Sequence, residues 1–257
     1  MLAGFARAVA HATPPRAVFA APLGGGMAVC DAPGSPLNKI AGLGFAPLDE
    51  QEFAAAERAF AVRDVPVQVE LATHAGSDVL TALTARGYRP VAFEDVLGCA
   101  LPTPLPAIAA GIATAPSPDQ DLDAWIDTMI LGFAQPDLQG AAAHEAFDRA
   151  AIERAMRDMQ AAPGFARYEA TADGRRAGAA GMRLQDGIAL LCGAATLPEH
   201  RRRGVQTALL GRRLGDAAAA GCDLAVLTTL PGSKSQQNAH RRGFWLLYSR
   251  IVLVKQA

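Results

Sequence analysis

The chain has 257 residues, of which 51% are hydrophobic, and its formal net charge is −1 at pH 7. This length can bury one large core or two ordinary ones, so it leaves the number of domains open. The nearly neutral charge argues against a nucleic-acid partner, and any anion that binds must meet a local cluster of cations.

The cysteines and the N-terminus bear on metal binding and compartment. Four cysteines are scattered without a C-x-x-C pair, which argues against a zinc site and against a dense disulfide framework. We therefore expect reduced thiols and no metal. Arg7 interrupts the segment where a signal peptide would keep its apolar core, and no stretch approaches about 20 uninterrupted apolar residues. The sequence thus predicts a cytoplasmic protein with no membrane partner.

The first part of the chain predicts a small domain of strands and helices. Gly24–Gly26 joins two short apolar runs, and no helix with Lys-Ser or Lys-Thr follows, so we interpret it as a turn rather than a phosphate loop. The predicted elements are strands at 17–21, 27–30 and 40–45, a helix at 49–61, a strand at 65–71, a helix at 77–86 that ends at Gly87, and a strand at 91–101.

A proline-rich segment follows, in which Pro102, Pro104 and Pro106 remove backbone donors and fix φ. We take residues 102–118 as the connection and expect domains at 1–103 and 104–257. The second domain is predicted to contain a short strand at 108–114, helices at 121–133 and 144–160, strands at 167–171, 177–184 and 188–196 with Asp-Gly turns between them, a helix at 208–220, a strand at 223–229, a helix at 235–242 and a strand at 245–255.

The two parts of the chain resemble each other at a fixed distance. A shift of 156 positions, from Gly87 to Gly243, aligns a strand, a Gly-Ser turn, a helix, a Gly-aromatic pair and a strand in the same order. Convergence of similar apolar strands is the alternative, but the Gly-Ser and Arg-Gly matches favour duplication. The shift pairs Leu71 with Leu227, Thr73 with Thr229, Gly76-Ser77 with Gly232-Ser233, and Arg86 with Arg242.

The strongest functional signal is the basic loop Leu197–Thr207, which joins the predicted strand at 188–196 to the following helix. Backbone N–H groups at a helix N-terminus, with the arginines at 201–203 nearby, form a natural site for a diphosphate. The repeat places this loop opposite Pro47–Gln51, which lacks the glycine and the arginines and contains two acidic residues. Their carboxylates would repel a diphosphate, so we expect one anion site, in the second domain.

The segments Leu197–Leu210 and Asn238–Phe244 resemble the GNAT superfamily of N-acetyltransferases. The signature of that family is a strand, then (Gln or Arg)-x-x-Gly-x-(Gly or Ala), then a helix. Arg201 and Gly204 fit this signature, whereas Gln206 stands where Gly or Ala is usual. The backbone amides of the loop are retained despite this difference.

The resemblance covers residues 112–257 and, through the repeat, extends over residues 16–101. It implies an α/β (α+β) fold of two tandem GNAT-like domains, each a mixed, largely antiparallel sheet flanked by helices, with a degenerate first domain that lacks the diphosphate loop. It also implies an N-acetyltransferase that moves an acetyl group from acetyl-CoA directly to a primary amine of a small molecule or peptide. Neither the identity of the acceptor nor the oligomeric state can be inferred from the sequence.

The family's mode of binding acyl-CoA assigns residues of this chain to the cofactor. The pantetheine arm would pair with the backbone at the end of the signature strand, and the diphosphate would lie on the loop amides. Asn238 matches a position that often contacts the CoA arm, although a role as a helix cap is equally open. The implied cofactor-binding residues are Ala194, Ala195, Thr196, Arg201, Arg202, Arg203, Gly204, Val205, Gln206, Thr207 and Asn238.

The proton chemistry is less well defined by the sequence. Many members of the family carry a tyrosine as the acid four residues before the Gly-aromatic pair, where this chain has Ala239. Tyr248 and Glu169 are then the candidate acid and base, with a purely structural place in a sheet as the alternative for both. We interpret Cys192 as a buried structural cysteine rather than an acyl carrier. The absent tyrosine leaves a second function open, that of an acyl-CoA-binding sensor or assembly protein without catalysis.

Overall fold

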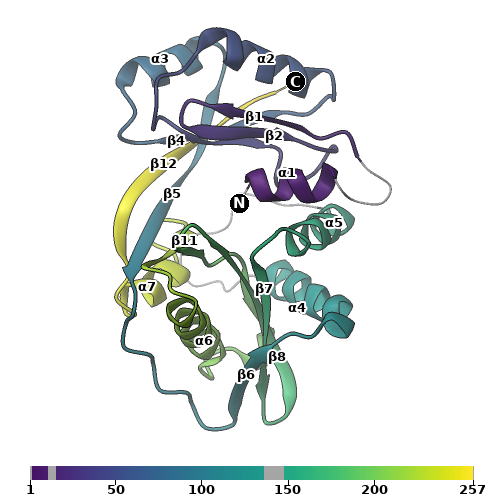
Figure 1. Cartoon of the computed structure of the whole chain (residues 1–257), viewed down its shortest axis with the longest axis vertical. Helices are drawn as coiled ribbons and strands as arrows, with labels where there is room; N and C mark the ends of the chain where they lie inside the picture. The colour runs from purple at the N-terminus through teal and green to yellow at the C-terminus, as the bar shows by residue number, and fades with distance from the viewer. Residues whose placement is uncertain (1, 11–15, 136–147, 257) are drawn as a thin grey trace. The chain divides into compact units, whose positions relative to one another are not determined.

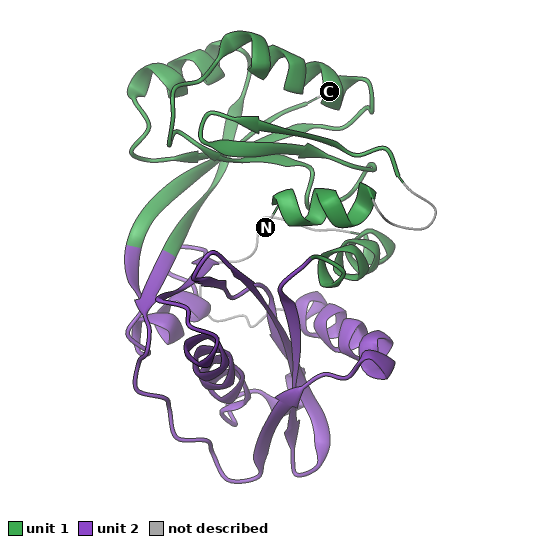
Figure 2. Ribbon diagram, in the orientation of Figure 1, with its two compact units in different colours: residues 1–96, 144–162, 247–257 green, residues 97–143, 163–246 purple. Residues whose placement is uncertain are grey.

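The computed structural model describes residues 2–10, 16–135 and 148–256. Contacts divide the chain into two compact units, which Figure 2 shows in different colours. No helix in the described ranges is both long enough and apolar enough to cross a membrane. Unit 1 contains residues 1–96, 144–162 and 247–257, and unit 2 contains residues 97–143 and 163–246.

Unit 1 is built on a mixed sheet (Figure 1). Its strands follow one another in the order β1 (Phe19–Leu23), β2 (Gly26–Cys30), β3 (Lys39–Leu43), β4 (Val67–Ala72), β12 (Trp245–Lys255) and β5 (Arg89–Ala100). β1 and β2 form the predicted hairpin, β3 runs parallel to β4, and β12, the last strand of the chain, pairs antiparallel with β4. The ends of β5 and β12 also contribute residues to unit 2.

α2 (Glu50–Ala61) and α3 (Ser77–Ala85) pack on one face of the sheet of unit 1. Phe53 of α2 and Leu83 of α3 are fully buried there together with Ile40 of β3. Apolar residues at alternate positions of the strands face these helices, as the pleat requires. Both helices confirm the prediction from the sequence.

α1 (Leu2–Ala10) and α5 (Arg149–Gln160) form a smaller core with β2 in unit 1. Phe5 of α1, Val29 of β2 and Ala155 of α5 are buried in it. The predicted helix at 144–160 is confirmed from Arg149 onward, and residues 144–147 lie outside the described residues. α1 was not predicted, because its 9 residues give too short a window for helical periodicity to be recognised.

The strands of unit 2 also pair in a mixed, largely antiparallel arrangement. The order is β11 (Leu224–Thr229), β9 (Ile188–Leu190), β8 (Arg175–Gln185), β7 (Phe165–Ala172) and β6 (Ile112–Pro116), with β10 (Ala194–Thr196) also paired to β8. Only β9 and β11 run parallel among these described strands. Asp173-Gly174 and Asp186-Gly187 have positive φ values of 50°, 76°, 51° and 75°, so both predicted two-residue turns are confirmed.

Helices lie on both sides of the sheet of unit 2 and confirm the predicted fold class. Figure 1 shows α4 (Leu122–Ala134) and α6 (Val205–Ala219) on opposite sides of β7 and β8. Tyr168 and Ala170 of β7 are buried in one core with Leu209 of α6. A short helix, α7 (Lys234–His240), follows β11.

The predicted repeat is present in the order of the elements. The shift of 156 positions carries α2 onto α6, β4 onto β11, α3 onto α7 and β5 onto β12. Arg89, the first residue of β5, falls on Trp245, the first residue of β12. The domain division at residues 103 and 104 remains a prediction, because the compact units reflect packing and not ancestry.

Trp125 tests how α4 is held against the sheet. Its side chain is 1% exposed, and its Nε1 donates to Tyr168 O at 3.1 Å and to Ala180 O at 3.2 Å. We expect Trp125→Phe to lower the free energy of unfolding by about 2–4 kcal/mol, because it leaves a cavity and removes a buried donor. Urea denaturation followed by far-UV circular dichroism measures this change. The control is Trp245→Phe, at a side chain that is 48% exposed, and equal losses in both variants would contradict the expectation.

Candidate functional site

A β-bulge divides the predicted strand at 188–196 into β9 and β10. Gly181 of β8 faces two residues, because its N–H donates to Cys192 O at 3.0 Å and to Gly193 O at 3.2 Å. The register with β8 therefore moves by one residue across the bulge. Gly193 has a φ of 62°, a left-handed conformation that suits glycine. The prediction of one continuous strand is wrong at this point.

β10 has a backbone edge without a strand partner. β9 runs parallel to β11, but among the described strands β10 pairs only with β8. Leu197 N donates to Ala177 O at 2.9 Å, so alternation along the antiparallel pair turns the peptide groups of Ala194 and Thr196 away from β8. This edge can pair with the amides of an extended ligand.

The loop after β10 leads into an open helix N-terminus. Arg202 and Gly204 have φ values of 61° and 91°, and Gly204 is the N-cap of α6 without a side-chain hydrogen bond. Within the described part of the chain, the N–H groups of residues 202–207 have no backbone acceptor. Such groups at a helix N-terminus are ready donors for an anion.

Arg201 contacts protein carbonyl groups. Its Nη2 donates to Gly132 O at 3.4 Å and to Gln135 O, and its Nε donates to Thr196 O at 3.4 Å. Gly132 and Gln135 lie at the C-terminal end of α4, where a cation also interacts favourably with the helix dipole. Arg201 therefore joins α4 to the end of β10, and a direct contact with a diphosphate stays a prediction.

The other two arginines of the loop differ in their surroundings. Arg203 forms an ion pair with Asp173 in the turn between β7 and β8. Arg202 is exposed, and its guanidinium has no partner among the residues that the structure describes. Of the three predicted arginines, Arg202 is the one whose charge is available to an incoming anion.

Asn238 lies inside α7 and not at its start. The N-cap of α7 is Ser233, whose hydroxyl accepts from Gln236 N at 3.1 Å, so the alternative role of Asn238 as a helix cap is wrong. Asn238 Nδ2 donates to Gln206 Oε1 at 2.6 Å, and its Oδ1 accepts from Arg241 Nη1 at 3.2 Å. Two residues predicted to bind the cofactor thus bind each other and connect α6 with α7.

The two candidate catalytic residues lie in different units. Tyr248 belongs to unit 1, where its ring packs edge-to-face against Phe45 at 5.2 Å and His74 at 5.5 Å between centroids. Burial raises the pKa of the Tyr248 hydroxyl. Glu169 belongs to unit 2 and forms an ion pair with Arg176 at 2.9 Å. No single unit brings them together, and their catalytic roles remain predictions.

Two residues beside the bulge were not found from the sequence. A Cβ at Gly132 would lie 2.6 Å from the Cβ of Ala195, so glycine lets α4 approach β10 closely. Arg213 of α6 is buried beside the bulge, and the only signal for it was an arginine within an apolar helical stripe. Burial raises the pKa of the neighbouring Cys192 thiol to about 11, which fits a structural cysteine.

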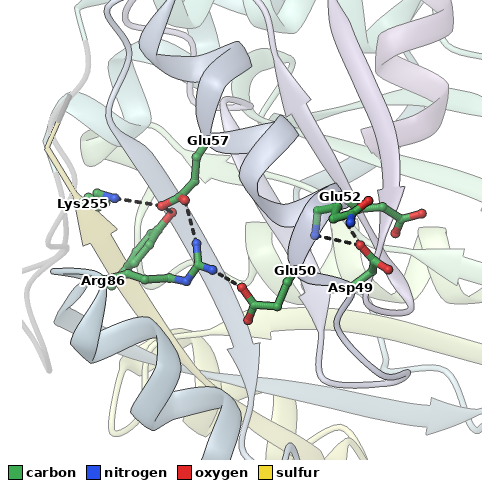
Figure 3. Close-up of polar contacts among 8 residues, drawn as sticks. Asp49, Glu50, Glu52, Glu57, Arg86 and Lys255 are labelled. Atoms are coloured by element: carbon green, nitrogen blue, oxygen red, sulfur yellow. Dashed lines mark hydrogen bonds and ion pairs between the residues drawn. The ribbon is translucent and has the colours of Figure 1, made fainter.

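The corresponding helix start in unit 1, that of α2, is capped by the side-chain carboxylate of Asp49. Asp49 Oδ1 accepts from Gln51 N at 2.8 Å and from Glu52 N at 2.9 Å (Figure 3). Glu50, on the same turn, forms an ion pair with Arg86. Acceptors of the protein itself therefore occupy the donors that an anion would need, as expected from the acidic residues in this segment.

A family model matches the part of the chain that contains these features. Residues 130–244 match the model of the Acetyltransferase (GNAT) family. The matched range includes the bulge, β10, the basic loop, α6 and α7. No curated protein sequence matches the chain.

Solved structures resemble the chain over most of its length. A GCN5-related N-acetyltransferase from Kribbella flavida is 18% identical with a TM-score of 0.69, and the match covers 100% of this chain and 93% of that one. One from Sphaerobacter thermophilus is 17% identical with a TM-score of 0.63, covering 91% and 81%. A tandem GNAT protein from the clavulanic acid biosynthesis pathway is 14% identical with a TM-score of 0.63, covering 91% and 79%. These likenesses establish the tandem GNAT fold.

The ion pair between Arg203 and Asp173 predicts a pH dependence. The hydrogen bond and charge of Arg203 lower the pKa of Asp173, so the carboxylate stays ionised at pH values where an ordinary aspartate is protonated, and the pair is lost only as the pH falls through the lowered pKa. We expect Arg203→Gln to raise the pKa of Asp173, measured by NMR titration of its carboxyl carbon. Arg202→Gln is the matched control, and an equal pKa of Asp173 in wild type and Arg203→Gln would contradict the pairing.

Proposed function

We propose that this chain, whose residues 130–244 belong to the Acetyltransferase (GNAT) family, transfers an acetyl group from acetyl-CoA directly to a primary amine. The observation that carries this proposal is that the unpaired edge of β10 is followed directly by the open N-terminus of α6. An extended arm can pair with the strand edge while a diphosphate accepts from the helix amides.

The chain has donors suited to each part of acetyl-CoA. Ala194, Ala195 and Thr196 of β10 would hold the pantetheine arm, and the exposed guanidinium of Arg202 would add a charge-assisted contact to the diphosphate. Arg201 and Asn238 would act mainly by holding α4 and α7 in place. The amides proposed for the diphosphate belong to Arg202, Arg203, Gly204, Val205, Gln206 and Thr207.

Acetyl-CoA would supply an acetyl group already activated as a thioester. Backbone N–H groups beside the bulge and at Thr196 are fixed donors that can stabilise the charge developing on the acyl oxygen. Positioning of the two reactants can account for a large part of the rate. We retain Glu169 as the candidate base, acting through water because Arg176 already pairs with it, and Tyr248 as the candidate acid.

A second candidate function is acyl-CoA binding without catalysis. It is favoured by one observation, that Ala239 stands at the position of the usual tyrosine and is 2% exposed within α7. No phenol can protonate a departing thiolate from that position. The two candidates share the cofactor site, and they differ only in whether the bound acetyl group is transferred.

Binding is tested with Gly204→Asp. Gly204 has a φ of 91°, and a Cβ there would lie 3.2 Å from the Cβ of Ala109, while the added carboxylate would repel the diphosphate. We expect isothermal titration to detect acetyl-CoA binding to the wild type and a loss of at least about tenfold in affinity for the variant. The control is Gly221→Asp after the other end of α6, where φ is 79° and no atom lies within 4 Å. A wild type that shows no heat at millimolar acetyl-CoA would refute the proposal.

Catalysis is tested by release of the CoA thiol. We expect the wild type to release free thiol from acetyl-CoA in the presence of at least one member of a panel of small primary amines and peptides with free N-termini. Gly204→Asp, which weakens binding, should release thiol correspondingly more slowly at subsaturating acetyl-CoA. Tight binding of acetyl-CoA with no amine-dependent thiol release across the panel would favour the sensor or assembly function instead.

A further inference from the structure

Arg213 is a buried cation that contacts both sides of the bulge. It projects from α6, and it is 3% exposed. Its Nη1 donates to Gly181 O at 2.9 Å and to Gly193 O at 3.3 Å. Its Nε donates to Leu209 O of its own helix at 3.2 Å. One guanidinium thus links α6 to the two strands between which the bulge forms.

These contacts fall where the strand ladder is interrupted. A bulge sets two residues against one, so the hydrogen bonds beside it depart from the regular pattern of a β-ladder. Gly181 O accepts otherwise from Cys192 N at 3.2 Å, and Gly193 O accepts from Gly181 N at 3.2 Å. Buried carbonyl groups need donors, and the guanidinium supplies a donor to both.

The charge of Arg213 has no carboxylate partner in the described part of the chain. Burial lowers the pKa of Arg213 to about 10, so the group is still a cation near neutral pH. Its neighbour Arg212 forms the ordinary surface pair of this helix, with Asp216 at 3.0 Å. Burying a cation whose hydrogen bonds go only to carbonyl groups carries a desolvation penalty. An apolar side chain would fill the same core position without that penalty.

We propose that Arg213 is a positioning residue for acetyl-CoA, and this rests on the function proposed above. By holding Gly181 and Gly193, it fixes the bulge and keeps the peptide groups of Ala194 and Thr196 turned away from β8, where the pantetheine arm pairs with them. Its hydrogen bonds go to Leu209, Gly181 and Gly193 and not to the basic loop Leu197–Thr207, which leads into the first turn of α6. Arg213 therefore serves the arm of the cofactor and not its nucleotide.

The proposed role can be measured because the pantetheine arm and the nucleotide of acetyl-CoA would bind to different parts of the site. The test compares the affinities of acetyl-CoA and of 3′-phosphoadenosine 5′-diphosphate, which lacks the pantetheine arm, by isothermal titration. Arg213→Met is expected to weaken acetyl-CoA binding by about tenfold and nucleotide binding by less than about twofold. Arg213→Lys keeps the positive charge and N–H donors but loses the planar guanidinium, so its acetyl-CoA affinity should lie between those of wild type and Arg213→Met. The matched control, Arg212→Met, should leave both affinities unchanged.

Equal losses of both ligands in Arg213→Met would overturn the proposal, and so would no loss of acetyl-CoA affinity. If Arg213→Met does not fold, the proposal is tested instead by amide hydrogen exchange in Arg213→Lys. The amides at 193–196 should then exchange at least about fivefold faster than in wild type, with the amides of α6 unchanged. Unchanged exchange at 193–196 would overturn the proposal. A wild type that binds neither ligand would refute the proposed function, while the exchange experiment would still test the hold of Arg213 on the bulge.

Discussion

The one-residue bulge opposite Gly181 is the constraint on which the candidate site depends. Without it, β9 and β10 would continue as one strand beside β11, and the peptide groups along that edge would be used within the sheet. With it, the strand leaves β11 while β8 still holds it. The unpaired backbone N–H groups of β10 are then followed along the chain by the unpaired N–H groups at the start of α6. Because these donors belong to the backbone, the site tolerates Gln206 where the family signature has a small residue, and the Gln206 side chain bonds Asn238 instead.

The first half of the chain has the corresponding elements, but it lacks the unpaired strand edge and the uncapped helix start. The register of β3 with β4 shifts between Ala41 and Leu43, but Leu43 still pairs with Leu71, so this edge of β3 is used inside the sheet. Asp49 caps α2 with its own carboxylate, a contact that typically stabilises a helix by about 1 kcal/mol. The corresponding helix start thus has a side-chain cap in the first half of the chain and uncapped backbone donors in the second. Because Gly204 has no side chain to cap α6, the donors there stay available for the anion that we propose.

Most elements could be predicted from the sequence, because their signals are local. Asp173-Gly174 marks a hairpin by itself, and Asp49 marks the start of a helix. The bulge could not be predicted, since Cys192-Gly193 continues an apolar run and the bulge depends on Gly181 in another strand. Sequence also identified the loop arginines but not their partners, which come from distant segments. The place of Asn238 within α7 likewise depends on where the helix is capped.

β12, which belongs to the second half of the repeat, pairs with β4 of the first half. Leu253 of the second copy lies opposite Val69 of the first, and Leu101, just past β5, donates to Asp223 O just before β11. β5 and β12 are counterparts in the repeat. β5 lies between β12 and β11 in the strand order, so each of the two strands pairs with a strand of the other half. Deleting the first copy would therefore remove a strand on which the second depends. This interdependence gives a physical reason for the chain to retain its first half.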